Sequence, residues 1–140
     1  MKTNRAMSEL LAHAQTKGSP VDDDYLNFIE REGCILIKSF CSELPIGFPD
    51  TAYFDQTDCE ASINHVHLES LSEGLNLVQA WENKLRFKYP AKAFVIVLKC
   101  DPDGTDVVAR FFQYRESDPT WLSSDLESYK SEALLVREIT

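Results

Sequence analysis

Two apolar segments on either side of a tight-turn sequence constrain the fold of this chain most. KAFVIVLKC and DVVARFFQYRE are rich in β-branched and aromatic residues, and DPDGT lies between them. Such segments favour strands, and Asp-Pro-Asp-Gly is typical of a turn in which a glycine takes a positive φ. The sequence therefore predicts a long antiparallel hairpin. DPDGTD also resembles half of a calcium loop, but it lacks the later bidentate Glu, so a turn accounts for it better.

The residues before the hairpin predict the longest helix of the chain. From Ser70 to Tyr89 apolar residues recur along one broad helical face, SLSE at 70–73 matches a capping box, and Pro90 ends the pattern. The basic stretch KLRFKYPAK at 84–92 superficially resembles a nucleic-acid patch. Lys and Arg in the last turns of a helix complement its dipole, and this role needs no ligand.

The rest of the chain predicts shorter elements. Apolar spacing and stop signals favour a helix over Asn4–Lys17, while 21–32 fits either a short helix, which we favour, or an extended segment. The further predictions are a strand over 33–40, a loop over 42–58 with Phe48, Tyr53 and Phe54 packed on the core, a strand over 59–69, a helical turn over 124–129 and a final strand over 132–139.

This order of elements indicates an α+β fold. A chain of 140 residues lies within the range of a single domain. We expect one domain over residues 1–140, with a mainly antiparallel sheet and the long helix packed across one face of it.

Apolar runs and cysteines indicate the compartment. The longest uncharged apolar run, Ala93–Leu98, is far shorter than the roughly 20 residues that span a bilayer, and the N-terminal residues lack the apolar core of a signal peptide. The four cysteines form no CxxC pair, and most lie in or beside strand-like segments. These features predict a cytoplasmic protein with free thiols.

Net charge narrows the choice of partner. The chain carries 23 acidic and 14 basic residues, which gives a net charge of −9. The excess is concentrated in residues 1–60 and 101–140, where 11 and 9 acidic residues stand against 5 and 4 basic ones. A phosphate backbone or an anionic membrane would be repelled, so we expect no nucleic acid and no membrane as partner. A basic partner is favoured.

Motifs for catalysis or metal binding are weak. The sequence has no Gly-rich phosphate loop, no GxSxG and no HExxH, so we expect no enzyme activity and no cofactor. His65 and His67 lie two residues apart in a predicted strand and could face one metal ion. No third ligand lies at a recognisable spacing, so the prediction is no metal site. A small metal-binding protein or hydrolase that uses this pair stays as an alternative.

The tail after the hairpin combines acidic and aromatic residues. Trp121 and Tyr129 are of the kind that anchor protein interfaces, and the carboxylates near them in sequence are Glu116, Asp118, Asp125 and Glu127. An acidic rim around aromatic anchors suits a basic protein partner. The same residues also fit a solvated charged face, or a lid in which Trp121 fixes the tail to the sheet, and both alternatives stay open.

Residues 68–138 resemble a known class of proteins. LESLSEGLNLVQAW, KAFVIVLKCDPDG, DVVARFFQYRE and DPTWLSSDLESY are similar in pattern and size to small acidic immunity proteins of bacterial toxin systems, including those of contact-dependent growth inhibition. The resemblance implies tight binding to a cognate toxin, and for some members a domain akin to the Whirly fold. It carries over no individual functional residue and gives no support to His65 or His67.

The sequence thus predicts a non-catalytic immunity protein that binds a basic, nuclease-like toxin domain through an acidic surface. A structural adaptor that forms a homodimer through a sheet edge is a further alternative. The predicted partner-binding residues are Asp101, Asp103, Asp106, Glu116, Asp118, Trp121, Asp125, Glu127 and Tyr129.

Overall fold

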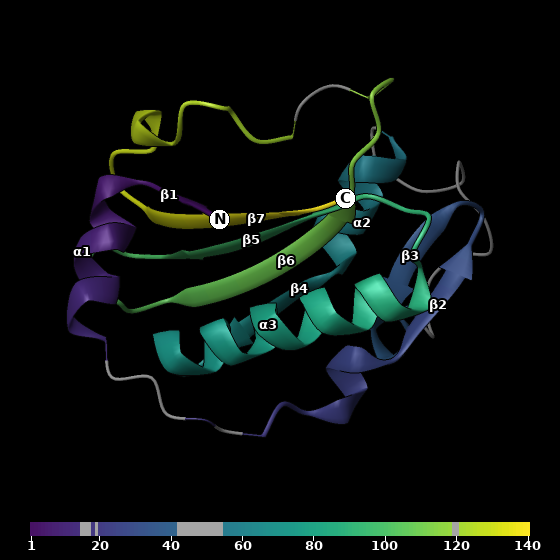
Figure 1. Cartoon of the computed structure of the whole chain (residues 1–140), viewed down its shortest axis with the longest axis horizontal. Coiled ribbons are helices and arrows are strands. Elements are labelled where there is room, and N and C mark those ends of the chain that lie inside the picture. Colours follow the sequence, from purple (N-terminus) through teal and green to yellow (C-terminus); the bar gives the residue numbers. More distant parts are fainter. Residues whose placement is uncertain (15–17, 19, 42–54, 119–120) are drawn as a thin grey trace.

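The predicted hairpin and the last strand form the centre of a five-stranded antiparallel sheet (Figure 1). The computed structural model describes residues 1–14, 18, 20–41, 55–118 and 121–140. The strand order is β1-β7-β5-β6-β4. The strands are β1 (Lys2–Thr3), β4 (His65–Leu68), β5 (Phe94–Cys100), β6 (Val107–Gln113) and β7 (Ala133–Ile139).

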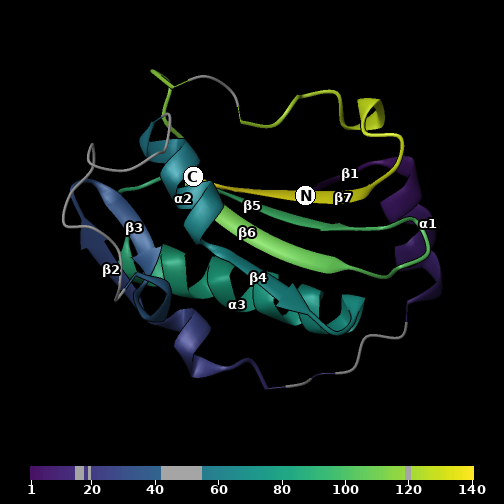
Figure 2. The same cartoon turned by 180° about the vertical axis from the view of Figure 1, so that it is seen from behind.

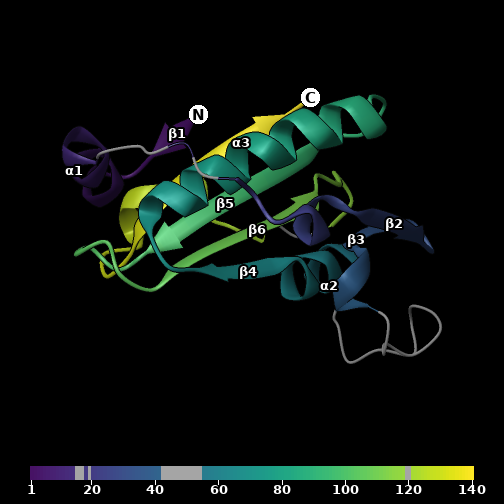
Figure 3. The same ribbon diagram turned by 90° about the horizontal axis from the view of Figure 1, so that it is seen from below.

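The long helix α3 (Leu71–Lys88) crosses one face of this sheet, as predicted (Figure 3). Ser70 caps it, because its Oγ accepts a hydrogen bond from the Glu73 amide at 3.2 Å. The Glu73 carboxylate accepts from the Glu69 amide, one residue earlier than a capping box requires. At Gly74 a Cβ would lie only 2.7 Å from Leu98 Cδ1, so glycine lets the helix lie close to the sheet.

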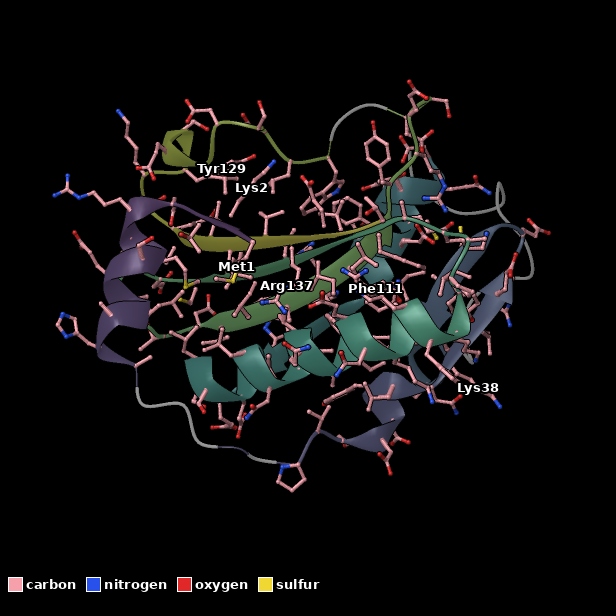
Figure 4. All side chains as sticks on the ribbon, viewed as in Figure 1. Met1, Lys2, Lys38, Phe111, Tyr129 and Arg137 are labelled. Carbon is pink, nitrogen blue, oxygen red and sulfur yellow. The ribbon has the colours of Figure 1, made fainter. Side chains whose placement is uncertain are left out.

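Large aromatic rings fill the space between α3 and the sheet. Trp81 of α3 is fully buried, and its ring centroid lies 4.9 Å from that of Phe111 on β6. Phe28 packs on the same Phe111 ring at 5.3 Å. The Trp81 indole donates to the Tyr25 carbonyl at 2.9 Å, so its polar group is satisfied. Figure 4 shows Phe111 in this layer.

The segment 59–69 differs from the predicted strand. Residues Gln56–Ile63 form the helix α2, and only His65–Leu68 form strand β4. Asp55 caps α2, with its carboxylate accepting from the Asp58 amide at 2.7 Å. Thr57, Cys59, Glu60, Ala61 and Ile63 are all buried. A helix buried almost all round shows no 3.6-residue period, and for this reason the alternation in the sequence indicated a strand.

A second, two-stranded sheet stands beside α2. It pairs β2 (Phe28–Arg31) with β3 (Cys34–Ile37), and the predicted strand over 33–40 therefore stops early, in a 3-10 turn at Lys38–Phe40. The favoured helix over 21–32 is limited to a 3-10 turn, Asp23–Leu26, and the rest is the strand β2. The extended alternative wins there because β2 pairs along its whole length with β3.

Glu60 of α2 and Asn64, the residue that caps the end of this helix, join the two sheets. Glu60 accepts hydrogen bonds from the Ile35 amide of β3 and the Gln113 amide of β6, at 2.7 and 2.9 Å. Asn64, four residues later, accepts from the Ile37 amide at 2.9 Å and donates to the Ile35 carbonyl at 2.8 Å. The free edge of β3 is thus paired with side chains rather than with another strand.

Glu60 is a buried carboxylate with a partner of opposite charge. Its exposed fraction is 0%, and the Arg115 guanidinium donates to its Oε1 at 2.6 Å. The Gln113 side chain donates to Oε2 at 2.6 Å. Together with the two backbone amides, these donors satisfy the charge that burial would otherwise destabilise.

The N-terminal helix is shorter than predicted. α1 spans Arg5–His13, and residues 15–17 of the predicted helix lie outside the described part of the chain. Asn4 caps α1 by accepting from the Met7 amide at 3.1 Å, and the same Oδ1 accepts from the Leu134 amide of β7 at 2.9 Å. Its Nδ2 donates to the Glu132 carbonyl at 2.8 Å. One buried amide therefore holds the start of α1 against β7.

The turn over 124–129 is present as a 3-10 turn, Leu126–Ser128, labelled η3 below, and the last strand is β7. Most of the predicted loop, with Phe48, Tyr53 and Phe54, lies outside the described residues. Within the described residues no helix is long and apolar enough to cross a bilayer.

All four cysteines are free and buried, as predicted. Cys34 and Cys59 share a hydrogen bond, which raises the pKa of Cys34 and lowers that of Cys59. Burial, with smaller contributions from Asp101 and Asp103, raises the pKa of Cys100 to about 11. Since the thiolate is the nucleophile, the Cys100 thiol is poorly reactive at neutral pH.

Replacing the buried carboxylate should destabilise the fold strongly. In a Glu60→Ala variant Arg115 keeps a charge without its partner, and the Ile35 and Gln113 amides lose their acceptors. We expect the free energy of unfolding to fall by about 3–5 kcal/mol, measured by urea denaturation. Glu9→Gln, an exposed change, is the control; a loss below about 1 kcal/mol for Glu60→Ala would contradict this role.

Alkylation should separate folded from unfolded Cys100. With a pKa of about 11, Cys100 holds far less thiolate at pH 8 than an ordinary cysteine. We expect iodoacetamide to label it at least roughly a hundredfold more slowly in the native protein than in urea, by peptide mass spectrometry. Equal labelling rates in the two conditions would show that the Cys100 thiol is accessible in the native protein and that its pKa is not raised.

Candidate functional site

The sheet face opposite α3 carries a second apolar cluster. Val95, Phe112 and Val136 come from three neighbouring strands and lie on this face. The tail residues Leu122, Leu126 and Tyr129 pack against them. Figure 2 shows the tail running along the sheet from the end near α2 to the end near α1. The tail therefore acts as a partial cover for this face.

Local hydrogen bonds hold the tail in this path. The Tyr129 hydroxyl accepts from the Ser123 amide at 2.8 Å, and the Asp125 carboxylate accepts from the Glu127 amide at 3.2 Å. Glu127 in turn accepts from the Arg5 amide at the first residue of α1, at 2.5 Å. Figure 4 labels Tyr129 in the tail. Tyr129 and Glu127 thus have structural roles in addition to any role in binding.

The Trp121 side chain, on the tail, is partly exposed to solvent. Its exposed fraction is 37%, so the indole is not sealed in the core. The Phe112 ring lies 5.5 Å from it, and the Arg110 guanidinium lies 4.9 Å over its ring. Arg110 also donates to the Ala61 carbonyl at 3.2 Å. Burial lowers the pKa of Arg110, partly offset by Glu132, and the ring contact stabilises the cation.

A hollow with a volume of about 220 Å³ opens between Trp121 and the sheet. Its floor is apolar and comes from β5, β6 and β7, and its walls come from the tail and the residues just after β6. The apolar lining of the hollow includes Val95, Phe112, Val136, Trp121 and Leu122. The charged residues at its rim are Lys2, Arg115, Glu116, Asp118 and Glu138.

The two basic side chains at this rim form ion pairs within the protein. Lys2 pairs with Glu138 at 3.2 Å, and Arg115 pairs with the buried Glu60. Asp118 accepts a hydrogen bond from the Thr57 hydroxyl at 2.6 Å, and Glu116 is exposed. Within the described ranges, neither Glu116 nor Asp118 takes part in an ion pair. Glu116 and Asp118 therefore keep their negative charge at the rim without an ion pair, while the Arg110 guanidinium, which forms no ion pair among the described residues either, lies on the Trp121 ring.

A second acidic region lies at the opposite end of the hairpin, and we call it the acidic end. It comprises exposed carboxylates on α1, on the β5–β6 turn and on η3: Glu9, Asp101, Asp103, Asp106, Asp125 and Glu127. Glu127 contacts the start of α1, and Gly104 of the turn lies against Leu10 of the same helix. Figure 1 shows the three elements together. Arg5, which pairs with Glu9, and His13 lie on α1, and Lys130 follows η3.

The predicted binding residues thus fall into two groups. Asp101, Asp103, Asp106, Asp125 and Glu127 belong to the acidic end, while Glu116, Asp118 and Trp121 line the hollow. The length of β6, about 20 Å at roughly 3.3 Å per residue, separates the turn carboxylates from Glu116 and Asp118, whereas Asp125 and Glu127 are sequence neighbours of Ser124 and Leu126, which line the hollow. Tyr129 is half-buried under the tail. The turn carboxylates therefore lie apart from Glu116, Asp118 and Trp121, while Asp125 and Glu127 lie on the tail beside the hollow.

The DPDGTD turn is internally bonded. Gly104 has a φ of +87° and Asp106 a φ of +55°, as a tight turn requires. The Thr105 hydroxyl and amide both donate to Asp103, at 2.6 and 3.0 Å, and these bonds lower the pKa of that carboxyl. Asp103 and Thr105 are bonded to each other within the turn, which agrees with the prediction of a hairpin connection.

His65 and His67 lie on the same side of β4, as their spacing predicted. Their ring centroids are 5.3 Å apart, and His65 Nδ1 contacts the Ser62 carbonyl at 2.7 Å. Across the described ranges, no group of three or more His, Cys, Asp or Glu side chains is placed to hold a metal ion. With its Nδ1 engaged, His65 keeps Nε2, so each ring of the pair can offer one nitrogen, fewer than the three or four protein ligands of a zinc site.

Sequence patterns did not identify several residues that shape the hollow. Arg110 and Phe112 belong to the predicted hairpin, but which face each occupies depends on pairing with β4, β5 and the tail. Glu60, which holds Arg115 at the rim, was expected in a strand. The alternation VARFFQ places Arg110 and Phe112 on one face, and that is the signal that could have joined them to Trp121.

Comparison with known proteins identifies the family. Residues 2–140 match the family described as Uncharacterized protein PM0498, so the chain belongs to this family over nearly its whole length. No curated protein and no solved structure matches the chain.

Fluorescence quenching should distinguish the two tryptophans. Trp121 is partly exposed, whereas Trp81 is fully buried, so iodide should quench only part of the emission. We expect a Trp121→Phe variant to lose the quenchable part and to unfold with a free energy lowered by about 1 kcal/mol, since ring stacking is only partly kept. Unchanged quenching in Trp121→Phe would place Trp121 in the core instead.

Proposed function

We propose that this protein is a non-catalytic immunity protein that binds and neutralises a basic toxin domain. The observation that carries the proposal is the acidic end, where exposed carboxylates from three elements gather on one side of the molecule. A nuclease-like domain is cationic because it must hold phosphate, and carboxylates on an inhibitor can take the positions of those phosphates. The cytoplasm is the proposed compartment, since a toxin of this kind acts there.

Electrostatics favour this function over a nucleic-acid or membrane role. The net charge of −9 opposes binding to phosphate or anionic lipid. Attraction between surfaces of opposite charge speeds the association of two proteins. Buried aromatic or apolar side chains then supply much of the binding energy. Trp121, half exposed beside the hollow, is the aromatic side chain best placed to be such an anchor.

The first test is binding to the polypeptide encoded immediately upstream of this gene. We expect the C-terminal domain of that polypeptide to be basic, to co-purify with this protein and to lose its toxic activity in the complex. An upstream polypeptide that neither binds nor is inhibited would overturn the proposal.

Charge-neutralising variants should then locate the interface. Asp101→Asn, Asp103→Asn and Asp106→Asn together remove three charges, while Asn still accepts hydrogen bonds and tolerates the positive φ at 106. We expect the association rate with the toxin domain to fall about tenfold at low salt and its dependence on salt to weaken. Stopped-flow mixing over a range of NaCl concentrations measures both effects.

The chain offers a matched control for this variant. Asp22, Asp23 and Asp24 are exposed and lie at the 3-10 turn before β2, away from the acidic end (Figure 1). Changing these three to Asn alters the net charge by the same amount. Equal slowing by both triple variants would indicate a general charge effect and would remove the acidic end from the interface.

A further inference from the structure

The hollow beside Trp121 has the size and shape for one side chain of a partner. Its volume of about 220 Å³ lies below the roughly 300–1,000 Å³ of pockets that hold small molecules or cofactors. The floor is formed by Val95, Phe112 and Val136, and the Trp121 indole forms one wall. Such a pocket matches the sites in which a single anchor residue of a protein partner is buried.

The charges at the rim determine which kind of partner side chain fits the hollow. The positive groups there, Lys2 and Arg115, are already paired with Glu138 and Glu60. Glu116 and Asp118 face the same opening and have no cation among the described residues. A side chain with an apolar stem and a positive tip would fill the floor with its stem and reach these carboxylates with its tip.

We propose that the hollow receives an arginine side chain of the basic partner. The inference rests on the proposed function, which supplies a cationic protein surface. Arginine fits the site better than lysine, because its planar guanidinium can donate two parallel hydrogen bonds to a carboxylate and can stack on an indole. The Trp121 ring already carries one guanidinium, that of Arg110, at 4.9 Å, so its surroundings suit this chemistry.

The hollow and the acidic end then affect different steps of binding. The acidic end lies at the far end of the hairpin and carries long-range attraction. The hollow offers a partly enclosed site in which a charged pair is stronger than on an open surface. Loss of the hollow should therefore raise the dissociation rate of the complex, whereas loss of charge at the acidic end should lower the association rate.

A small probe tests the hollow without any partner. N-acetyl-arginine amide is titrated into ¹⁵N-labelled protein, and N-acetyl-citrulline amide, which has the same shape without the charge, is the matched control. We expect the arginine compound to shift the Trp121 indole resonance and the amides of 112–118 and 121–126, with an affinity at least tenfold above that of citrulline. A Trp121→Phe spectrum assigns the indole resonance.

Variants identify the carboxylates. Glu116→Gln with Asp118→Asn should weaken the arginine compound about tenfold, and the Asn still accepts the Thr57 hydrogen bond that holds the loop. Glu116→Gln alone, an exposed change, gives the same direction if the double variant is unstable. The triple Asn variant at 101, 103 and 106 should bind the compound unchanged.

Three results would overturn the inference: equal affinity for citrulline, shifts confined to the acidic end, or full affinity in the Glu116 and Asp118 variants. These results are independent of the first proposal. If the upstream polypeptide binds but the arginine compound does not, the hollow is not an arginine site and the immunity function stands. If the compound binds and the upstream polypeptide does not, the proposed function fails alone.

Discussion

The structure depends on one buried charge and the backbone that it satisfies. Glu60 and Asn64 lie on one side of α2 and pair with amides of β3 and with β6, so the small sheet, the helix and the large sheet meet at two side chains. A strand edge in a protein core must find partners for its amides, because unpaired buried groups are costly. Here side chains pair with the edge of β3 in place of a third strand of the small sheet, and Arg115 neutralises the carboxylate.

That constraint also shapes the candidate site. Arg115 leaves β6 toward Glu60, and its guanidinium also donates to the Gly33 carbonyl at 3.1 Å and the Thr57 hydroxyl at 3.0 Å. Thr57 in turn donates to Asp118, at the rim of the hollow. A continuous chain of hydrogen bonds therefore runs from the buried carboxylate to the surface. The rim keeps its negative groups because the nearest guanidinium is held inward.

Much of the fold could be predicted from the sequence, and the failures have physical causes. The hairpin, the long helix and the final strand were evident because each has one buried face and clear end signals, such as Ser70, Pro90 and Gly104. α2 was mistaken for a strand because it is buried almost all round. The separation of about 20 Å between Asp106 and Phe112 is the length of the predicted strand and was available from the sequence, whereas the contact of Trp121 with Phe112 depends on how the tail crosses the sheet and could not be predicted.

The pairing of the two chain ends has a consequence for biosynthesis. Among the described strands β1 pairs with β7 alone, and Asn4 needs the Leu134 amide and the Glu132 carbonyl to complete its bonds. The bonds of β1 and Asn4 therefore cannot form until residues 132–136 have been synthesised. Docking of α1 thus depends on a strand about 130 residues later in the chain, and until β7 has formed the apolar side of α1 is exposed to chaperones.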